Sequence, residues 1–260
     1  MKIFIPMAGK GTRLRPFTLT CPKPLINILD KPIVEHLIDQ ITSKVKSNID
    51  EIVYILGDES YFNAEVVNSL NIISEKYNAK TKIYRQLEQL GTGHAIMCAE
   101  ESLSGPSIIA YADTMIHGNI EIDRQVDGIM WVKKVDNPSA YGVVNLDNEN
   151  KITELIEKPA EFISDLAVVG IYYFKEAANL RGYLRKHLSE KLNPGKEYLL
   201  NYGIEKMIKN GDSFIPKEID IWMDCGTPEL LLNSTKIIMD TYHDNVDANR
   251  VFDKEVIIKP

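Results

Sequence analysis

Apolar and polar positions along the first half of the chain follow two alternating periods. Short β-like runs occur at 2–6, 51–56, 82–84 and 107–111, and those at 2–6, 51–56 and 107–111 are typical of buried strands. Apolar residues recur at helical spacing over 33–45, 61–77 and 93–101. Strands that alternate with helices predict βαβ units. We therefore expect an α/β, Rossmann-like, mostly parallel sheet flanked by helices.

The pattern changes after residue 113. Four β-like runs with little helix between them follow at 128–135, 141–146, 151–157 and 166–174. They predict a β-rich, antiparallel extension, which makes the whole sheet mixed. Helical periodicity returns at 177–187, 197–209 and 230–242, with one further strand expected over 213–223. Thr227 directly precedes Pro228, which is typical of the start of the last helix.

The length of 260 residues and the hydrophobic content of 44% are typical of a globular protein with one substantial core. We expect one domain over 1–240 and a C-terminal tail over 241–260. The tail ends in the apolar run 256–260, which stops at a proline. This run has two interpretations, a terminal edge strand or the start of a further domain.

The charges and the cysteines argue against several classes of protein. A formal net charge of −7 lacks the basic surplus expected of a general nucleic-acid or anionic-membrane binder. No apolar stretch approaches the roughly 18 residues that a membrane-spanning helix needs. Three widely separated cysteines fit neither a disulfide framework nor a zinc site. We expect a cytoplasmic protein with neither nucleic acid nor membrane as a partner.

The residues with the clearest chemistry follow the first strand directly. Small or polar residues of this loop are Ala8, Gly9, Gly11 and Thr12. Small residues let backbone N–H groups approach a polyphosphate, and ligands of open α/β sheets bind beyond the carboxyl ends of the strands. Arg13 offers a planar fork of donors to phosphate, and Lys23 adds a compact positive charge. The plainer interpretation is a Gly-rich turn with solvated basic residues.

Three short motifs near the start resemble the signature of the sugar-phosphate nucleotidylyltransferases. They are Gly11-Thr12-Arg13-Leu14, Pro16 with Thr18, and Pro22-Lys23-Pro24-Leu25. The resemblance continues at intervals to about Asp240. It implies that the protein joins a nucleoside triphosphate to a sugar-1-phosphate and releases pyrophosphate. It also implies nucleotide binding by the loop over 8–12 and catalytic roles for Arg13 and Lys23.

A second segment, Gln86 to Ala95, resembles the family's base-recognition segment. The amide of Gln86 can pair with the carbonyl and N–H edge of uracil or thymine, and Gly91 permits close backbone contact. The form LGTGHA is similar to that of uridylyltransferases acting on N-acetylglucosamine-1-phosphate, so the resemblance favours UTP, with dTTP next. A plainer interpretation makes Thr92 a helix cap. His94 is a poor candidate for a general base, because phosphoryl-type transfer depends mainly on charge and alignment.

Two aspartates fall on the family's metal-ligand positions. Asp113 follows the buried strand at 107–111, and Asp224 lies in Trp222-Met223-Asp224-Cys225-Gly226-Thr227. Hard carboxylates together with phosphate oxygens and water suit Mg²⁺. One departure is Ala112, where the family usually has glycine.

The sugar-phosphate site is implied by Gly142, Glu157, Lys158 and Gly170. Glu157 can accept hydrogen bonds from two hydroxyls, and Lys158 can neutralise the sugar phosphate. Many relatives carry Thr or Asn where this chain has Val168-Val169. Glucose-1-phosphate and N-acetylglucosamine-1-phosphate both stay open as acceptors.

Two alternatives stay open at this stage. One is a cytidylyltransferase for a non-sugar phosphate such as phosphocholine, and the other is a catalytically silent nucleotide-sugar-binding regulator. Retention of both basic residues and both aspartates favours the enzyme. Relatives are often dimers or tetramers, so the resemblance also implies a homo-oligomer.

Overall fold

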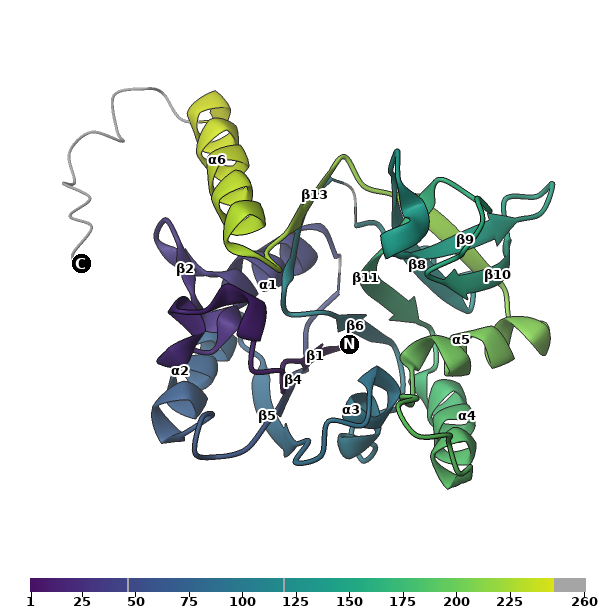
Figure 1. Cartoon of the computed structure of the whole chain (residues 1–260), viewed down its shortest axis with the longest axis horizontal. Coiled ribbons are helices and arrows are strands. Elements are labelled where there is room, and N and C mark those ends of the chain that lie inside the picture. Colours follow the sequence, from purple (N-terminus) through teal and green to yellow (C-terminus); the bar gives the residue numbers. More distant parts are fainter. Residues whose placement is uncertain (46, 119, 246–260) are drawn as a thin grey trace.

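The computed structural model describes residues 1–45, 47–118 and 120–245 (Figure 1). The tail expected over 241–260 lies outside the described residues from 246 onward, so both interpretations of 256–260 stay predictions. A nine-stranded sheet forms the centre, and seven of its strands follow the order β10-β9-β11-β6-β1-β4-β5. The other two strands extend it where β8 pairs with β11 and β12 pairs with β8.

Four parallel strands form the first half of the sheet. They are β1 (Lys2–Pro6), β4 (Glu51–Leu56), β5 (Lys80–Arg85) and β6 (Ser107–Ala110). Because consecutive side chains on a strand point to opposite faces, Ile3 and Ile5 face one layer of helices and Phe4 faces another. The prediction of βαβ units with helices on both faces is confirmed.

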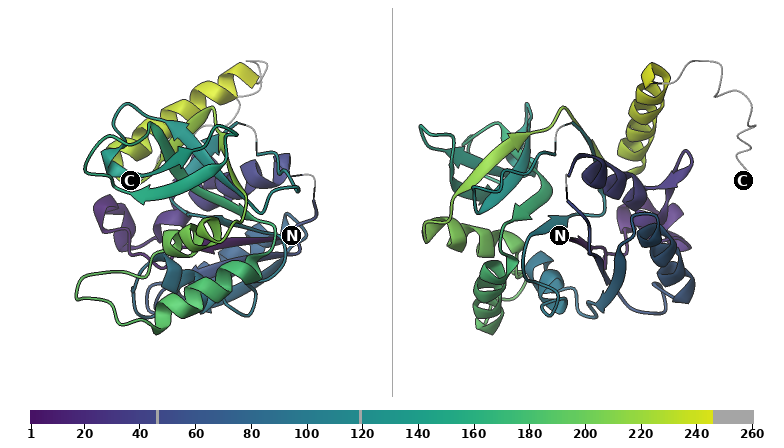
Figure 2. Two further views of the ribbon diagram at one scale, coloured as in Figure 1. Left: turned by 90° about the vertical axis from the view of Figure 1, so that its right-hand side faces the viewer. Right: turned by 180° about the vertical axis from the view of Figure 1, so that it is seen from behind.

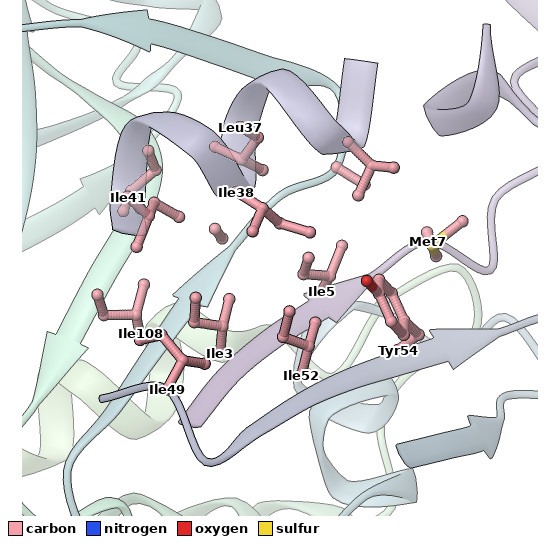
Figure 3. Packing of buried hydrophobic residues seen from close by; sticks show 14 of the residues in the cluster. Ile3, Ile5, Met7, Leu37, Ile38, Ile41, Ile49, Ile52, Tyr54 and Ile108 are labelled. Atoms are coloured by element: carbon pink, nitrogen blue, oxygen red, sulfur yellow. The ribbon is translucent and has the colours of Figure 1, made fainter. Parts of the chain in front are cut away.

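The first face of the sheet is covered by α1 (Ile33–Lys44) and α2 (Ala64–Glu75). Figure 3 shows Leu37, Ile38 and Ile41 of α1 packing over the isoleucines of the strands. Asn63 caps α2, since its side chain accepts hydrogen bonds from two backbone N–H groups. The expected helix over 61–77 therefore begins three residues later, after this cap.

The opposite face is covered by three helices, α3 (Thr92–Cys98), α4 (Ala177–Ser189) and α5 (Leu200–Lys209). Their apolar residues pack against Phe4, Val53 and Ile55 of the strands. Figure 1 shows α4 and α5 at the edge away from α2, beneath the antiparallel strands. This placement brings the start of α5 next to α3, although more than a hundred residues separate them in the chain.

The antiparallel extension follows the prediction. Its strands are β8 (Gly128–Lys134), β9 (Gly142–Leu146), β10 (Ile152–Glu157) and β11 (Leu166–Phe174). Strand β11 joins the two halves, because β8 pairs along one of its edges, while β9 and β6 pair with successive parts of the other edge. The two views of Figure 2 show this extension standing beside the parallel half.

The prediction of a single strand over 213–223 is wrong. The segment forms two strands, β12 (Phe214–Glu218) and β13 (Ile221–Asp224), separated by a turn. Strand β12 pairs with β8, whereas β13 pairs with β7 (Thr114–His117), which the apolar pattern did not reveal. The break matters for the site, because it allows the chain to leave one sheet and bring Asp224 beside Thr114.

The last helix, α6 (Pro228–Asn245), starts as expected after Thr227, whose hydroxyl accepts from the Leu230 N–H at 3.3 Å. Shorter elements near the start are β2 (Asn27–Ile28), β3 (Lys31–Pro32), and 3₁₀ turns at Thr12–Leu14, Phe17–Leu19 and Lys23–Leu25. A fourth 3₁₀ turn spans Pro138–Ala140. The turns near the start replace a helix directly after β1, and they fold the loop back over the end of that strand.

Candidate active site

A cavity of about 490 Å³ opens at the carboxyl ends of β1 and β6. Ten of the residues expected to bind nucleotide, phosphate or metal line it, namely Ala8, Gly9, Gly11, Thr12, Arg13, Lys23, Gln86, Gly91, Thr92 and Asp113. Five other expected residues do not line it, namely Gly142, Glu157, Lys158, Gly170 and Asp224. The first group comes from the parallel half of the sheet. The second group comes from the later part of the chain.

The glycine loop is held in a fixed shape. Gly11 has a φ of 59°, and its carbonyl accepts a hydrogen bond from the Thr18 hydroxyl at 2.8 Å. A Cβ at this position would lie 3.0 Å from Thr18 Cγ2 and 3.1 Å from Lys23 Cβ. Glycine is therefore required both by the left-handed backbone and by the close approach of the 3₁₀ turns.

Lys23 is almost buried, with 8% of its surface exposed, and its Nζ donates to Asp113 Oδ2 at 2.9 Å. The Asp113 side chain keeps 43% of its surface exposed and faces the cavity. A buried ammonium group needs a partner, and the carboxylate supplies it. The ion pair places one positive and one negative group where a phosphate and a cation could both be bound.

Asp224 lies next to this pair. The Gly226 N–H, which belongs to a cavity-lining residue, donates to Asp224 Oδ1 at 2.7 Å. The Cys225 N–H donates to the Asp113 carbonyl at 3.0 Å, which holds β13 against the start of β7. Burial and then the nearby charge of Asp113 raise the pKa of Asp224. Two carboxylates that repel each other are a suitable donor set for a divalent cation, which would remove that repulsion.

The base-recognition segment is built around glycine. A Cβ on Gly91, whose φ is 117°, would lie 2.6 Å from the Tyr198 carbonyl oxygen. The Gly93 N–H donates to the same oxygen at 2.7 Å. The interpretation of Thr92 as a helix cap is wrong, because Gly91 is the cap residue and the Thr92 hydroxyl accepts from the Leu200 N–H at 3.0 Å. Thr92 instead links α3 to α5.

Gln89 also lines the cavity, and its Nε2 donates to the Ala8 carbonyl at 3.1 Å. This residue was not singled out from the sequence. Gln89 lies within the segment that resembles the family's base-recognition segment, so its amide could have been identified from the sequence as a candidate site group. The contact connects the base-recognition segment to the glycine loop.

Three residues of the second group, Gly142, Glu157 and Lys158, gather where β9 begins and β10 ends, whereas Gly170 lies in β11 and Asp224 in β13. A Cβ on Gly142 would lie 3.1 Å from Glu157 Oε2, so these two residues are neighbours, as expected. The exposed Glu157 carboxylate accepts from Asn201 Nδ2 at 2.8 Å. Lys158 has a φ of 45° and is exposed. Asn201, at the start of α5, was missed because nothing in its sequence surroundings connects it to Glu157.

Tyr111 connects the two groups. It lines the cavity, and its hydroxyl hydrogen bonds to the side chains of Thr92 and Tyr172. Burial, with smaller effects from Glu157 and Asp113, raises the pKa of Tyr111 to about 12. A Cβ on Gly170, whose φ is 84°, would lie 2.6 Å from the Tyr111 ring. Gly170 therefore makes room for this tyrosine.

Trp222 lies at the same side of the site. Its ring packs edge to face against Tyr141, with 4.8 Å between the ring centroids. Its Nε1 is buried and has no hydrogen-bond partner within 1–45, 47–118 and 120–245. A buried indole N–H without a partner is unusual in a folded protein, and a bound ligand could supply an acceptor.

The structure gives two further findings about candidate sites. No helix of the described part of the chain is long and apolar enough to cross a membrane. Across the same described residues, no cluster of three or more His, Cys, Asp and Glu side chains could hold a metal ion by itself. A metal held by Asp113 and Asp224 would therefore need ligands from water or from a bound phosphate.

The sequence has relatives among known proteins. The nucleotidyl transferase family model matches residues 4–241. The chain is 30% identical over 274 residues to the bifunctional protein GlmU of Methanococcus maripaludis, covering 100% of this chain and 62% of that protein. It is 30% identical to the UTP–glucose-1-phosphate uridylyltransferase AglF of Haloferax volcanii, covering 88% of this chain and 93% of that protein.

The fold has solved counterparts. The nucleoside-diphosphate-sugar pyrophosphorylase from Vibrio cholerae superimposes with a TM-score of 0.75 at 18% identity, covering 90% of this chain and 99% of that chain. The chain spans about three fifths of the length of the first curated relatives it matches. The family match nevertheless runs from β1 to α6 and includes both aspartates. This chain therefore belongs to the nucleotidyl transferase family.

Proposed function

We propose that this protein is a sugar-1-phosphate nucleotidylyltransferase that uses UTP, with dTTP as the next choice, and a hexose-1-phosphate. The observation that supports this best is the ion pair of Lys23 and Asp113 inside the cavity, with Arg13 and Asp224 beside it. A site for two phosphorylated substrates needs positive charge for phosphate oxygens and carboxylates for a cation. The name of the relative AglF, a UTP–glucose-1-phosphate uridylyltransferase that is 30% identical to this chain, also supports it.

The reaction we propose is direct attack by a sugar-phosphate oxygen on the α-phosphorus of the triphosphate. The bond from the α-phosphorus to the bridging oxygen breaks, and pyrophosphate leaves. The attacking phosphate is already anionic at neutral pH, so no side chain has to remove a proton. The barrier consists mainly of charge repulsion and alignment.

The residues have distinct tasks in this proposal. The glycine loop and Gly91 allow backbone groups to approach the nucleotide, while Lys23 and Arg13 compensate charge on its phosphates. Asp113 and Asp224 would hold Mg²⁺, which when bound neutralises charge on the phosphate oxygens. Glu157 and Gly142 would orient the sugar, and the exposed Lys158 would contact the sugar phosphate.

The experiment that tests this proposal is a pyrophosphate-release assay with Mg²⁺. It crosses UTP, dTTP, CTP, ATP and GTP with a panel of sugar-1-phosphates and phosphocholine. We expect release only when UTP or dTTP and one hexose-1-phosphate are both present. Release with CTP and phosphocholine alone would contradict the proposal. If folded protein that binds nucleotide released no pyrophosphate with any substrate pair, the result would indicate a regulatory protein that only binds nucleotide-sugar.

Two substitutions test the charge assignment. Lys23→Ala and Asp224→Ala should each lower kcat by about 10²–10³-fold or more, the usual effect of removing a group that stabilises transition-state charge. Lys151→Ala is a suitable control, because Lys151 is exposed and its ion pair is with Glu149. Its kcat should equal that of the wild type. Near-normal turnover in either test variant would refute the roles given to Lys23 and Asp224.

A further inference from the structure

The side chain of Gln86 makes hydrogen bonds that the phosphate chemistry does not explain. Gln86 directly follows β5, lines the cavity, and has only 6% of its surface exposed. Its Nε2 donates to the Gly91 carbonyl at 3.0 Å and also lies 3.0 Å from Nδ1 of His94. A buried amide held by two partners has one orientation, and that orientation can be deduced.

The Gly91 carbonyl determines which way the amide points. A carbonyl oxygen only accepts hydrogen bonds, so the atom of Gln86 that faces it has to be the nitrogen. The reversed amide would place two oxygens against each other. Since Nε2 is therefore a donor toward His94, Nδ1 of His94 has to be the acceptor.

This requirement fixes the state of the His94 ring. An accepting Nδ1 belongs to a neutral imidazole that carries its proton on Nε2. Burial lowers the pKa of His94, which favours the neutral ring at physiological pH. The contact with Gln86 and the burial of the ring therefore agree on a neutral imidazole.

The consequence concerns the remaining atom of Gln86. Both hydrogens of Nε2 are used by Gly91 and His94, so Oε1 is the atom of this amide left to meet a ligand. An isolated glutamine can present either a donor or an acceptor, but this one can only accept. N3 of uracil and thymine carries a hydrogen and can donate to such an oxygen. N3 of cytosine carries a lone pair and would be repelled.

We propose that His94 is a positioning residue that holds Gln86 as an acceptor only, and that it thereby makes the nucleotide site select uracil or thymine over cytosine. This rests on the proposed function only in placing the base at Gln86. His94 takes no part in the bond-forming step. Its effect is on the relative binding of nucleotides that differ at the pyrimidine edge.

The test compares His94→Leu with His94→Asn in the full chain. Leucine removes the acceptor, so the amide of Gln86 is free to turn. Asparagine places its Oδ1 near the position of Nδ1 and can still accept from Gln86. For each protein, Kd for UTP and for CTP is measured by calorimetry without a sugar-phosphate. The ratio of kcat/KM for the two nucleotides is then measured with the best sugar-1-phosphate.

In His94→Leu we expect the preference for UTP over CTP to fall by about tenfold, the usual worth of one buried hydrogen bond to a ligand. His94→Asn should keep most of the preference. Thermal unfolding checks that both variants are folded. An unchanged preference in folded His94→Leu, or an equal loss in both variants, would overturn the proposal.

The Kd measurements for UTP and CTP separate this inference from the proposed function, because they need no catalysis. Protein that binds UTP better than CTP through His94 but never releases pyrophosphate would contradict the enzyme assignment and leave the role of His94 standing. Turnover with UTP, combined with a preference for UTP over CTP that is the same in the His94 variants, would support the enzyme assignment and contradict the role of His94.

Discussion

The two sides of the site are built in different ways. The nucleotide side lies at the ends of parallel strands, and two glycines of its base-recognition segment, Gly91 and Gly93, closely approach backbone atoms of 198–199. Gly91 is the clearest case, because a Cβ there would lie 2.6 Å from the Tyr198 carbonyl oxygen. On the side assigned to the sugar, a Cβ on Gly142 would meet only side-chain atoms, of which the carboxylate oxygen of Glu157 is the nearest, at 3.1 Å.

This difference indicates how each side tolerates change. A backbone atom cannot move without moving its whole segment, whereas an exposed glutamate can rotate about its side-chain bonds. The nucleotide side is therefore rigid and intolerant of substitution. The other side is adjustable where Gly142 faces Glu157.

The largest effect is expected for Gly91→Ala. The φ of 117° and the contact with Tyr198 both oppose a Cβ, so the variant should lose about 1–3 kcal/mol of folding free energy. Its kcat/KM for the nucleotide should fall by about a hundredfold, the loss reported for small displacements of positioned groups. Chemical denaturation and steady-state kinetics measure the two effects.

Gly182→Ala is the matched control for this glycine. Gly182 lies inside α4, and a Cβ there would meet nothing within 4 Å. This variant should keep its activity and gain roughly 0.5–1 kcal/mol of stability from helix propensity. If Gly91→Ala behaved like Gly182→Ala, the nucleotide side would not be as rigid as described.

A medium effect is expected for Asn201→Leu. The substitution removes the hydrogen bond from Asn201 Nδ2 to Glu157, so the carboxylate loses its fixed orientation. The KM for the sugar-phosphate should rise by about 3–10-fold, in line with one lost hydrogen bond, while the KM for UTP stays the same. An equal rise in both KM values would show that Asn201 acts on the whole site and not on Glu157.

The smallest effect is expected for Gly142→Ala, the counterpart of Gly91→Ala on the adjustable side. Because Glu157 has to shift by only a few tenths of an ångström to make room for the added methyl group and can keep its hydrogen bond with Asn201, the KM for the sugar-phosphate should change by less than about threefold. Stability should be unchanged in a thermal melt. A loss as large as that of Gly91→Ala would remove the contrast between the two sides.

Local patterns in the sequence were sufficient for much of this structure. Three strands of the parallel half, β1, β4 and β6, are short apolar runs, and the glycine loop follows β1 without interruption, so these parts were predictable. The two strands in 213–223 were not, because their division depends on partners in β8 and β7 that lie far away in the chain.

The same limit applies to individual side chains. Gln86 was identified from its motif, but its hydrogen bond to His94 depends on how α3 begins after Gly91. Asn201 meets Glu157 only because α5 packs beside β10. Spacing along the chain contains no information about such contacts, since they arise from tertiary packing.

The pairing of β13 with β7 has a consequence for biosynthesis. Asp224 is added to the growing chain 111 residues after Asp113 (224 − 113), on β13, the last strand of the described residues. Closing so long a loop is slow and depends on the intervening sheet being in place. A nascent chain can therefore build its glycine loop early but acquires the pair of carboxylates only after β13 has been made. The cation site stays incomplete until nearly the whole domain has been translated.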